Sequence, residues 1–304
     1  MTRSITLFFI GLFCAAPALA CNLESDTARL EISTYISDGL TCLEHPPENF
    51  RFDTAVERAF VDKINAERTG KGLTELVVRG ALLPAARYQS LDMGVNAFFD
   101  HESPDGRRAS DRIAAFDRTL LAQSTGENIA VFGPARCYDQ NDAEVSCVNL
   151  PGFELPTAAF VAEDLHQKLM DSEGHRANIM SEDYTHLAVG VARTDTGFYV
   201  TQVFTNRVGI LSTPLPTQFE TTGVLSVDPN LTGWEIGEIA VIDPTGTRLD
   251  IESDDLSNVP TGSNSLIVRG ETSRDEKRGS RNYTVKEWLD LSGPSFTLHA
   301  PKGS

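Results

Sequence analysis

Basic residues are scarce in this chain. Its 304 residues include 26 lysines and arginines against 43 aspartates and glutamates, so the formal net charge is −17. Such a surface repels phosphate backbones and anionic lipid headgroups, which argues against nucleic acids as partners. The hydrophobic fraction of 40 % is ordinary for a globular protein, and a packed core is therefore expected.

Long apolar runs are missing beyond the first 20 residues. Arg3 precedes an apolar segment from Ile5 to Ala16, and Ala18-Leu19-Ala20 matches the small-residue motif of a signal-peptide cleavage site. Residues 1–20 are therefore predicted to be a secretory signal peptide, and no later segment is apolar enough to span a bilayer. We expect a secreted or periplasmic protein that is not integral to the membrane.

Cysteine is also rare. Of the five cysteines, Cys14 belongs to the predicted signal peptide, and the other four are Cys21, Cys42, Cys137 and Cys147. An even number in an exported protein favours two disulfide bonds. Pairing of neighbours gives Cys21–Cys42 and Cys137–Cys147, although four cysteines allow three connectivities. The alternative is a lipoprotein anchored at Cys21, which loosely fits a lipobox but would leave Cys42 unpaired.

Helical periodicity of apolar residues dominates the first two thirds of the chain. Four helices are predicted. The first begins near Asp53 and ends at Gly70, and the others cover about 81–96, 109–116 and 157–171. Two strands are predicted over about 185–193 and 198–208, joined by a tight hairpin. Residues 21–51 are expected to form an irregular leader held by a disulfide, and residues 133–156 a long loop held by another.

The composition changes after Asn206. Pro214 and Pro216 mark a linker, and short β-prone runs separated by turn residues follow. We therefore divide the chain into a signal peptide (1–20), a leader (21–51), a central domain (52–209), and a linker with a small β-rich module (210–304). That last module could dock a protein partner.

Three residues stand out as candidates for chemistry. His101 lies in a Phe-Phe-Asp-His-Glu-Ser-Pro segment, Glu127 in Gly-Glu-Asn-Ile-Ala, and His175 in Ser-Glu-Gly-His-Arg-Ala-Asn-Ile. Imidazoles and a carboxylate suit a metal site or acid–base chemistry. The two histidines could bind Zn²⁺ or another divalent cation weakly, with Glu127 orienting one ring. The alternative is a metal-free site in which the histidines bond to Glu127 and to backbone carbonyls.

These segments together resemble the CAP superfamily, which includes cysteine-rich secretory proteins, antigen 5 and class 1 pathogenesis-related proteins. The resemblance rests on Ile64-Asn65-Ala66-Glu67-Arg68, the three segments above and the Val200-Thr201-Gln202-Val203-Phe204 strand. It covers about residues 55–207 and is closest to the bacterial secreted branch. It implies an α+β fold, a three-layer α–β–α sandwich around an antiparallel sheet, with the β-rich module added to it.

The resemblance also implies a cavity lined by two histidines and two glutamates. His101, His175 and Glu127 match three of these positions. At the fourth, Ser172 stands where the family has its second glutamate, and Leu169 replaces the tryptophan three residues before it. Glu173 is the neighbouring carboxylate that could reach in. The acidic set is therefore incomplete.

The best functional prediction is an exported binding protein rather than an enzyme. Its ligand would be a lipid, a small hydrophobic molecule, a glycan or a cell-wall component, with a possible divalent metal at His101 and His175. The first alternative is a secreted metal-dependent hydrolase or peptidase with Glu127 as general base, or with Ser172 and His175 as nucleophile and base. The second alternative is a scaffold whose cavity is vestigial.

Overall fold

The computed structural model describes residues 21, 23, 31–133, 137–138, 144–147, 150, 152–278 and 281–301. The predicted signal peptide, residues 1–20, lies outside the described residues. In the described part of the chain, no helix is both long and apolar enough to cross a membrane.

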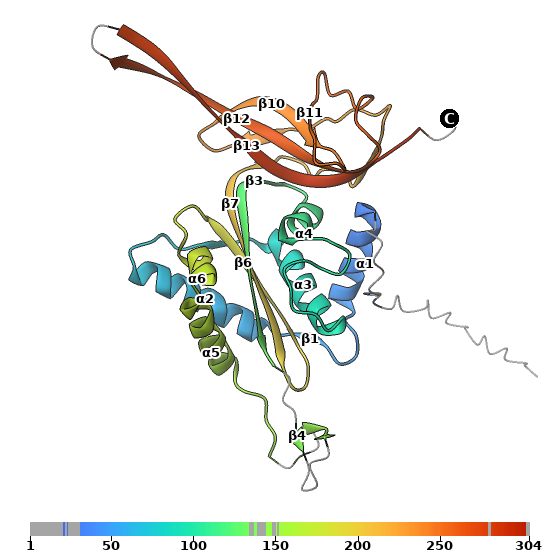
Figure 1. Ribbon diagram of the computed structural model, residues 1–304, viewed down its shortest axis with the longest axis vertical. Helices are drawn as coiled ribbons and strands as arrows, with labels where there is room; N and C mark the ends of the chain where they lie inside the picture. The colour runs from blue at the N-terminus through green and yellow to red at the C-terminus, as the bar shows by residue number, and fades with distance from the viewer. Residues whose placement is uncertain are drawn as a thin grey trace, which may run out of the picture.

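Helices and strands alternate in the first two thirds of the chain, and strands follow (Figure 1). The helices are α1 (Ile32–Glu44), α2 (Thr54–Gly70), the 3₁₀ helix η1 (Gly80–Leu82), α3 (Leu83–Val95), α4 (Ala109–Phe116), α5 (Ala158–Asp171) and α6 (Glu173–Met180). The strands are β1 (Arg51–Phe52), β2 (Val77–Val78), β3 (Leu120–Phe132), β4 (Cys137–Tyr138), β5 (Glu144–Val145), β6 (His186–Arg193), β7 (Phe198–Leu211), β8 (Gln218–Glu220), β9 (Pro229–Leu231), β10 (Glu235–Ile242), β11 (Arg248–Asp250), β12 (Gly262–Arg278) and β13 (Arg281–His299).

The central domain is the three-layer α–β–α sandwich that was predicted. Its antiparallel sheet has the order β1-β6-β7-β3. Helices α2, α5 and α6 cover one face, and α1, α3 and α4 cover the other (Figure 1). Because both faces are covered, nearly every residue of β6 is buried. Four predicted helices and the β6–β7 hairpin are confirmed to within about two residues.

Local sequence signals explain where the helices begin and how closely they pack. The carboxylate of Asp53 accepts hydrogen bonds from the backbone nitrogens of Ala55 and Val56, which caps α2. On the opposite face, α3 lies directly against Gly190 of β6. A Cβ at Gly190 would collide with the backbone of Ala86 and Arg87. The glycine therefore sets the distance between helix and sheet.

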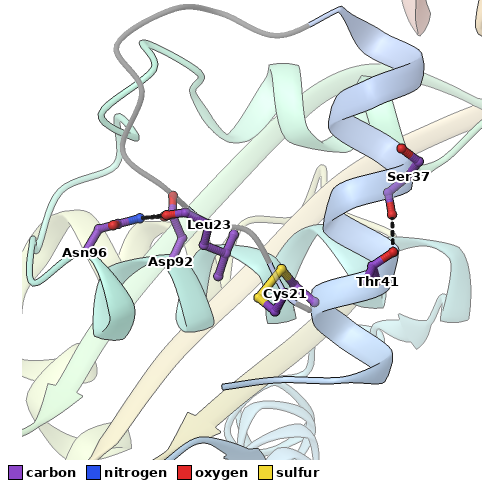
Figure 2. The surroundings of a disulfide bond; sticks show 7 residues. Cys21, Leu23, Ser37, Thr41, Asp92 and Asn96 are labelled. Carbon is purple, nitrogen blue, oxygen red and sulfur yellow. Dashed lines mark hydrogen bonds between the residues drawn. A yellow bond between two sulfur atoms is a disulfide. The ribbon is translucent and has the colours of Figure 1, made fainter. Parts of the chain in front are cut away.

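The leader is not irregular, as the sequence had suggested, because residues 32–44 form α1. Ile32, Tyr35, Gly39 and Cys42 bury one side of this helix. The spacing of three, four and three residues is helical, but glycine and β-branched residues obscured it. Disulfides join Cys21 to Cys42 and Cys137 to Cys147, which is the expected pairing of neighbours. Beside the first, Asn96 at the end of α3 donates to the carbonyl of Leu23 (Figure 2).

The β-rich region after Leu211 continues the central sheet, whereas the sequence predicted a module behind a linker. Ser292 of β13 pairs with Ala122 of β3, and β9 pairs with the end of β7. Arg118 reinforces this junction by donating to the carbonyls of Leu215, Pro216 and Ser295. Pro214 and Pro216 therefore lie in a connecting segment that is hydrogen-bonded to Arg118, just after α4.

The longest strands were missed by the sequence analysis. β12 and β13 form a hairpin in which Gly262 pairs with Leu298 and Arg278 with Arg281. Its outer part pairs with no strand beyond itself among the described residues, and it projects from the body of the molecule (Figure 1). The stretch from Glu271 to Asn282 is polar at every position except Gly279, so hydrophobic alternation did not reveal it. The base packs its own aliphatic core, which includes Leu121, Leu225, Val268, Leu291 and Phe296.

Candidate functional site

The site is built around Glu127, which lies in the middle of β3. β3 runs from Leu120 to Phe132 and carries Glu127 inside the sheet. Gly126 precedes it because a Cβ there would meet the hydroxyl of Tyr184. The side chain of Glu127 is only 3 % exposed. A buried carboxylate of this kind needs partners for both of its oxygens.

His101 and Arg112 supply those partners. The Nδ1 atom of His101 lies 2.9 Å from Oε1 of Glu127, and Nη2 of Arg112 donates to Oε2 at 2.7 Å. The hydrogen bond to Glu127 raises the pKa of His101 above its ordinary value, although burial opposes this. Since the His101 side chain is 51 % exposed, the imidazole is fixed at Nδ1 while its other side faces outward.

Arg112 also holds the loop that carries His101. Its side chain is 1 % exposed and donates to the carbonyl oxygens of His101 and Arg107 and to the hydroxyl of Ser103. The contacts show that it ties α4, the loop and β3 together around the carboxylate.

His175 approaches from the first helical turn of α6. Its backbone carbonyl accepts a hydrogen bond from Nδ2 of Asn128, at 3.1 Å. Asn178 donates to the carbonyl of Glu127 and to the side chain of Asn128. These asparagines join α6 to β3 next to Glu127. Burial, and then the positive charge of His101, lower the pKa of His175 below its ordinary value.

Ser172 and Glu173 do not join this network. Ser172 lies between α5 and α6, and its hydroxyl makes no hydrogen bond with any described residue. Its carbonyl instead accepts from the backbone of Arg176. Glu173 is exposed at the start of α6. Neither residue replaces the missing second glutamate, and a Ser172–His175 nucleophile–base pair has no hydrogen bond to support it.

The donor set limits any metal that could bind here. Among the described residues, no group of three or more histidines, cysteines, aspartates or glutamates is arranged to hold a metal ion. Glu127 is engaged with His101 and Arg112, so the imidazoles of His101 and His175 are what remains. Two imidazoles fit a weak, exchangeable site completed by water, and not a closed structural site.

Sequence reasoning missed Asn128 and Asn178, which position α6 beside the carboxylate. A signal was present, because asparagine is unfavourable in the middle of a strand unless its side chain is bonded. His166 and His186, which lie outside the motifs, are both buried. Burial lowers the pKa of His186 to about 4, so this ring is neutral.

Comparison with known proteins agrees with the fold and the motifs. The model of the cysteine-rich secretory protein family, CAP, matches residues 61–204. Two Bacillus subtilis proteins are similar to this chain. The uncharacterized protein YkwD is 31 % identical over 151 residues, which are 50 % of this chain and 47 % of that protein. The uncharacterized membrane protein YlbC is 30 % identical over 157 residues, which are 52 % of this chain and 36 % of that protein. The chain thus spans less than half the length of either curated relative.

Two solved structures are also similar. One is an extracellular protein containing an SCP domain from Bacillus anthracis, with 26 % identity and a TM-score of 0.37, covering 50 % of this chain and 41 % of that chain. The other is an outer surface protein from Borrelia burgdorferi, with 16 % identity and a TM-score of 0.38, covering 52 % and 98 %. Residues 61–204, which carry the motifs and most of the sandwich, thus match the CAP, or cysteine-rich secretory protein, family.

Proposed function

We propose that this CAP-domain protein is an extracytoplasmic binding protein whose His101–His175 site takes a divalent cation weakly. The observation that supports this most strongly is the chain of contacts from Arg112 through Glu127 to Nδ1 of His101. A carboxylate bonded to one ring nitrogen fixes the tautomer and leaves Nε2 as a lone-pair donor. This is the arrangement that an imidazole ligand needs.

The same contacts favour binding over hydrolysis. A general base must reach the proton that it abstracts, either directly or through one water. Both oxygens of Glu127 are engaged with protein groups, and the side chain is buried. Glu127 therefore acts on His101 as a positioning residue. When bound, a divalent cation would polarise a carbonyl or phosphoryl oxygen of a ligand.

Export to an oxidising compartment is part of the proposal. Disulfides such as Cys21–Cys42 and Cys137–Cys147 persist outside the cytosol. The Cys21 sulfur is engaged in a disulfide, which favours the unlipidated form over anchoring at that cysteine. The proposed ligand is a lipid, a small hydrophobic molecule, a glycan or a cell-wall component. Docking of a protein partner through the β-rich region stays a prediction.

Zinc titration by calorimetry tests the cation site. We expect saturable, weak binding to the wild type, and loss of at least about tenfold in affinity for His101→Ala combined with His175→Ala. His45→Ala is the matched control, because His45 is exposed just after α1, outside the site. Equal zinc affinity in the double variant and the wild type would remove the two histidines from the proposal.

A further inference from the structure

A cavity lies away from the His101–His175 site, between the end of α2 and the start of β6. Its volume is about 540 Å³, within the range of small-molecule sites. The polar residues along it include Arg68, Glu75, Glu182, Tyr184 and His186. None of the three residues of the candidate site lines it. The cavity therefore needs its own explanation.

Arg68 forms the inner wall of this cavity. It is 1 % exposed, and its Nε and Nη1 atoms donate to the backbone carbonyls of Thr74, Ile179 and Ser181. Within the described residues, no carboxylate pairs with this guanidinium, and Nη2 makes no hydrogen bond. A buried cation held only by carbonyls retains donor capacity for an added acceptor.

Acceptors lie at the rim. Glu75 and Glu182 are exposed, and in the described part of the chain neither carboxylate makes an ion pair or side-chain hydrogen bond. Val77 is 58 % exposed, and the ring of Tyr184 stacks on Phe204. The cavity thus offers a hydrogen-bond donor at its inner wall, hydrogen-bond acceptors at its rim, and some apolar surface on Val77 and Tyr184.

The charged residues that line the cavity limit the class of ligand that it could bind. Two rim carboxylates, on a chain of net charge −17, repel anions. The guanidinium at the inner wall disfavours a cation that would enter fully. An apolar ligand would desolvate Arg68 and the carboxylates without replacing their hydrogen bonds. A neutral polyhydroxylated molecule can accept from Arg68, donate to the glutamates and lay its C–H faces on Val77 and Tyr184.

We propose that this cavity, between α2 and β6, binds an uncharged oligosaccharide. Tyr184 also lies against Gly126, the residue before Glu127, so the cavity adjoins the strand that carries the candidate site. The proposal does not depend on metal binding by His101 and His175.

Calorimetric titration of the full mature chain tests this, with cellotetraose, maltotetraose and triacetylchitotriose as neutral probes and trigalacturonic acid as the anionic probe. We expect saturable binding of at least one neutral probe, stronger than that of the anionic probe. Glu75→Ala combined with Glu182→Ala should weaken it about tenfold or more. Tyr184→Phe should weaken it less. The His101→Ala variant should retain it.

A matched control is Glu48→Ala combined with Glu252→Ala, which removes the same charge from exposed positions outside the cavity. This control should bind as the wild type does. Three results would overturn the proposal: no saturable binding of any neutral probe, stronger binding of trigalacturonic acid, or equal affinities in the cavity variant and the control. Loss of binding in the His101→Ala variant would also overturn it, by moving the ligand to the other site.

Discussion

The central domain and the β-rich region use charged residues in opposite ways. In the domain, three buried carboxylates each pair with an arginine: Glu127 with Arg112, Glu57 with Arg87, and Asp117 with Arg79. In the β-rich region, Arg248, Arg269 and Asp290 form a partly exposed network on the sheet surface. The core beneath this network is built from apolar side chains.

This difference indicates where the fold is organised around a site. A buried ion pair is costly to desolvate, and removing one partner costs far more than the pair contributes. Such pairs persist where they hold a particular geometry, as Arg112 does for Glu127 and His101. Exposed pairs contribute little to stability, and those of the hairpin keep a projecting ribbon soluble.

Removing Arg112 should have the largest effect. Arg112→Ala leaves Glu127 buried without its cationic partner and frees the loop of His101, so we expect the free energy of unfolding to fall by about 3–5 kcal/mol. Arg269→Ala is the matched change in the β-rich region and should cost no more than about 1 kcal/mol. Denaturation in urea measures both. Equal losses would break the contrast between the two regions.

The second largest difference between the two regions is expected when a buried glycine is replaced by alanine. Gly190→Ala drives a methyl group into the backbone of α3, and we expect a loss of about 2–3 kcal/mol in unfolding free energy. In the β-rich region, a Cβ at Gly293 would meet the side chains of Leu266 and Leu121 at 3.1–3.2 Å. These can shift, so Gly293→Ala should cost under about 1 kcal/mol. Thermal unfolding of the two variants measures both losses of stability. A larger loss for Gly293→Ala than for Gly190→Ala would contradict this prediction.

A pH effect is expected from the buried histidine of the central domain. Folding lowers the pKa of His186 to about 4, through burial and then the charges of Arg207 and Arg79. The unfolded chain, with an ordinary pKa of about 6.5, binds a proton that the folded chain does not. Stability from this group is therefore complete above pH 6.5 and is lost as the pH falls towards 4.

The loss should amount to about 1–2 kcal/mol after solvent screening. Urea denaturation between pH 7 and pH 4 measures it, with His186→Gln as the comparison. The variant should lose less stability than the wild type over that interval. Parallel pH curves for the two proteins would show that His186 does not contribute.

The smallest effect is expected at Trp288 on the projecting hairpin, which is 65 % exposed. Trp288→Thr keeps a β-compatible residue and should change the unfolding free energy by less than about 0.5 kcal/mol. Urea denaturation at pH 7 measures it. A loss of several kcal/mol would show that this tryptophan is covered in solution.

Much of the central domain could be predicted from the sequence, because its helices have regular apolar spacing and strong boundaries such as Asp53 and Gly70. The pairing of Cys21 with Cys42 followed from cysteine number and proximity. The β12–β13 hairpin could not be predicted, because the outer part of β12 lacks the alternation of apolar and polar residues that marks a strand. The continuous sheet could not either, since one bridge between Ala122 and Ser292 leaves no local signal.

For the site, the motifs identified His101, Glu127 and His175. They did not indicate that both oxygens of Glu127 would be engaged, because this depends on Arg112 reaching β3 from α4. That tertiary contact favours the role of orienting His101 over the alternative role of general base for Glu127. Spacing along the chain cannot reveal it.

The most direct test is an NMR titration of the His101 imidazole in the wild type and in Glu127→Gln. The account predicts the Nδ1-protonated tautomer in the wild type, with a pKa above the ordinary value that falls when the carboxylate is replaced by an amide. An Nε2-protonated ring, or a His101 pKa that is unchanged in Glu127→Gln, would contradict the central claim that Glu127 positions this histidine.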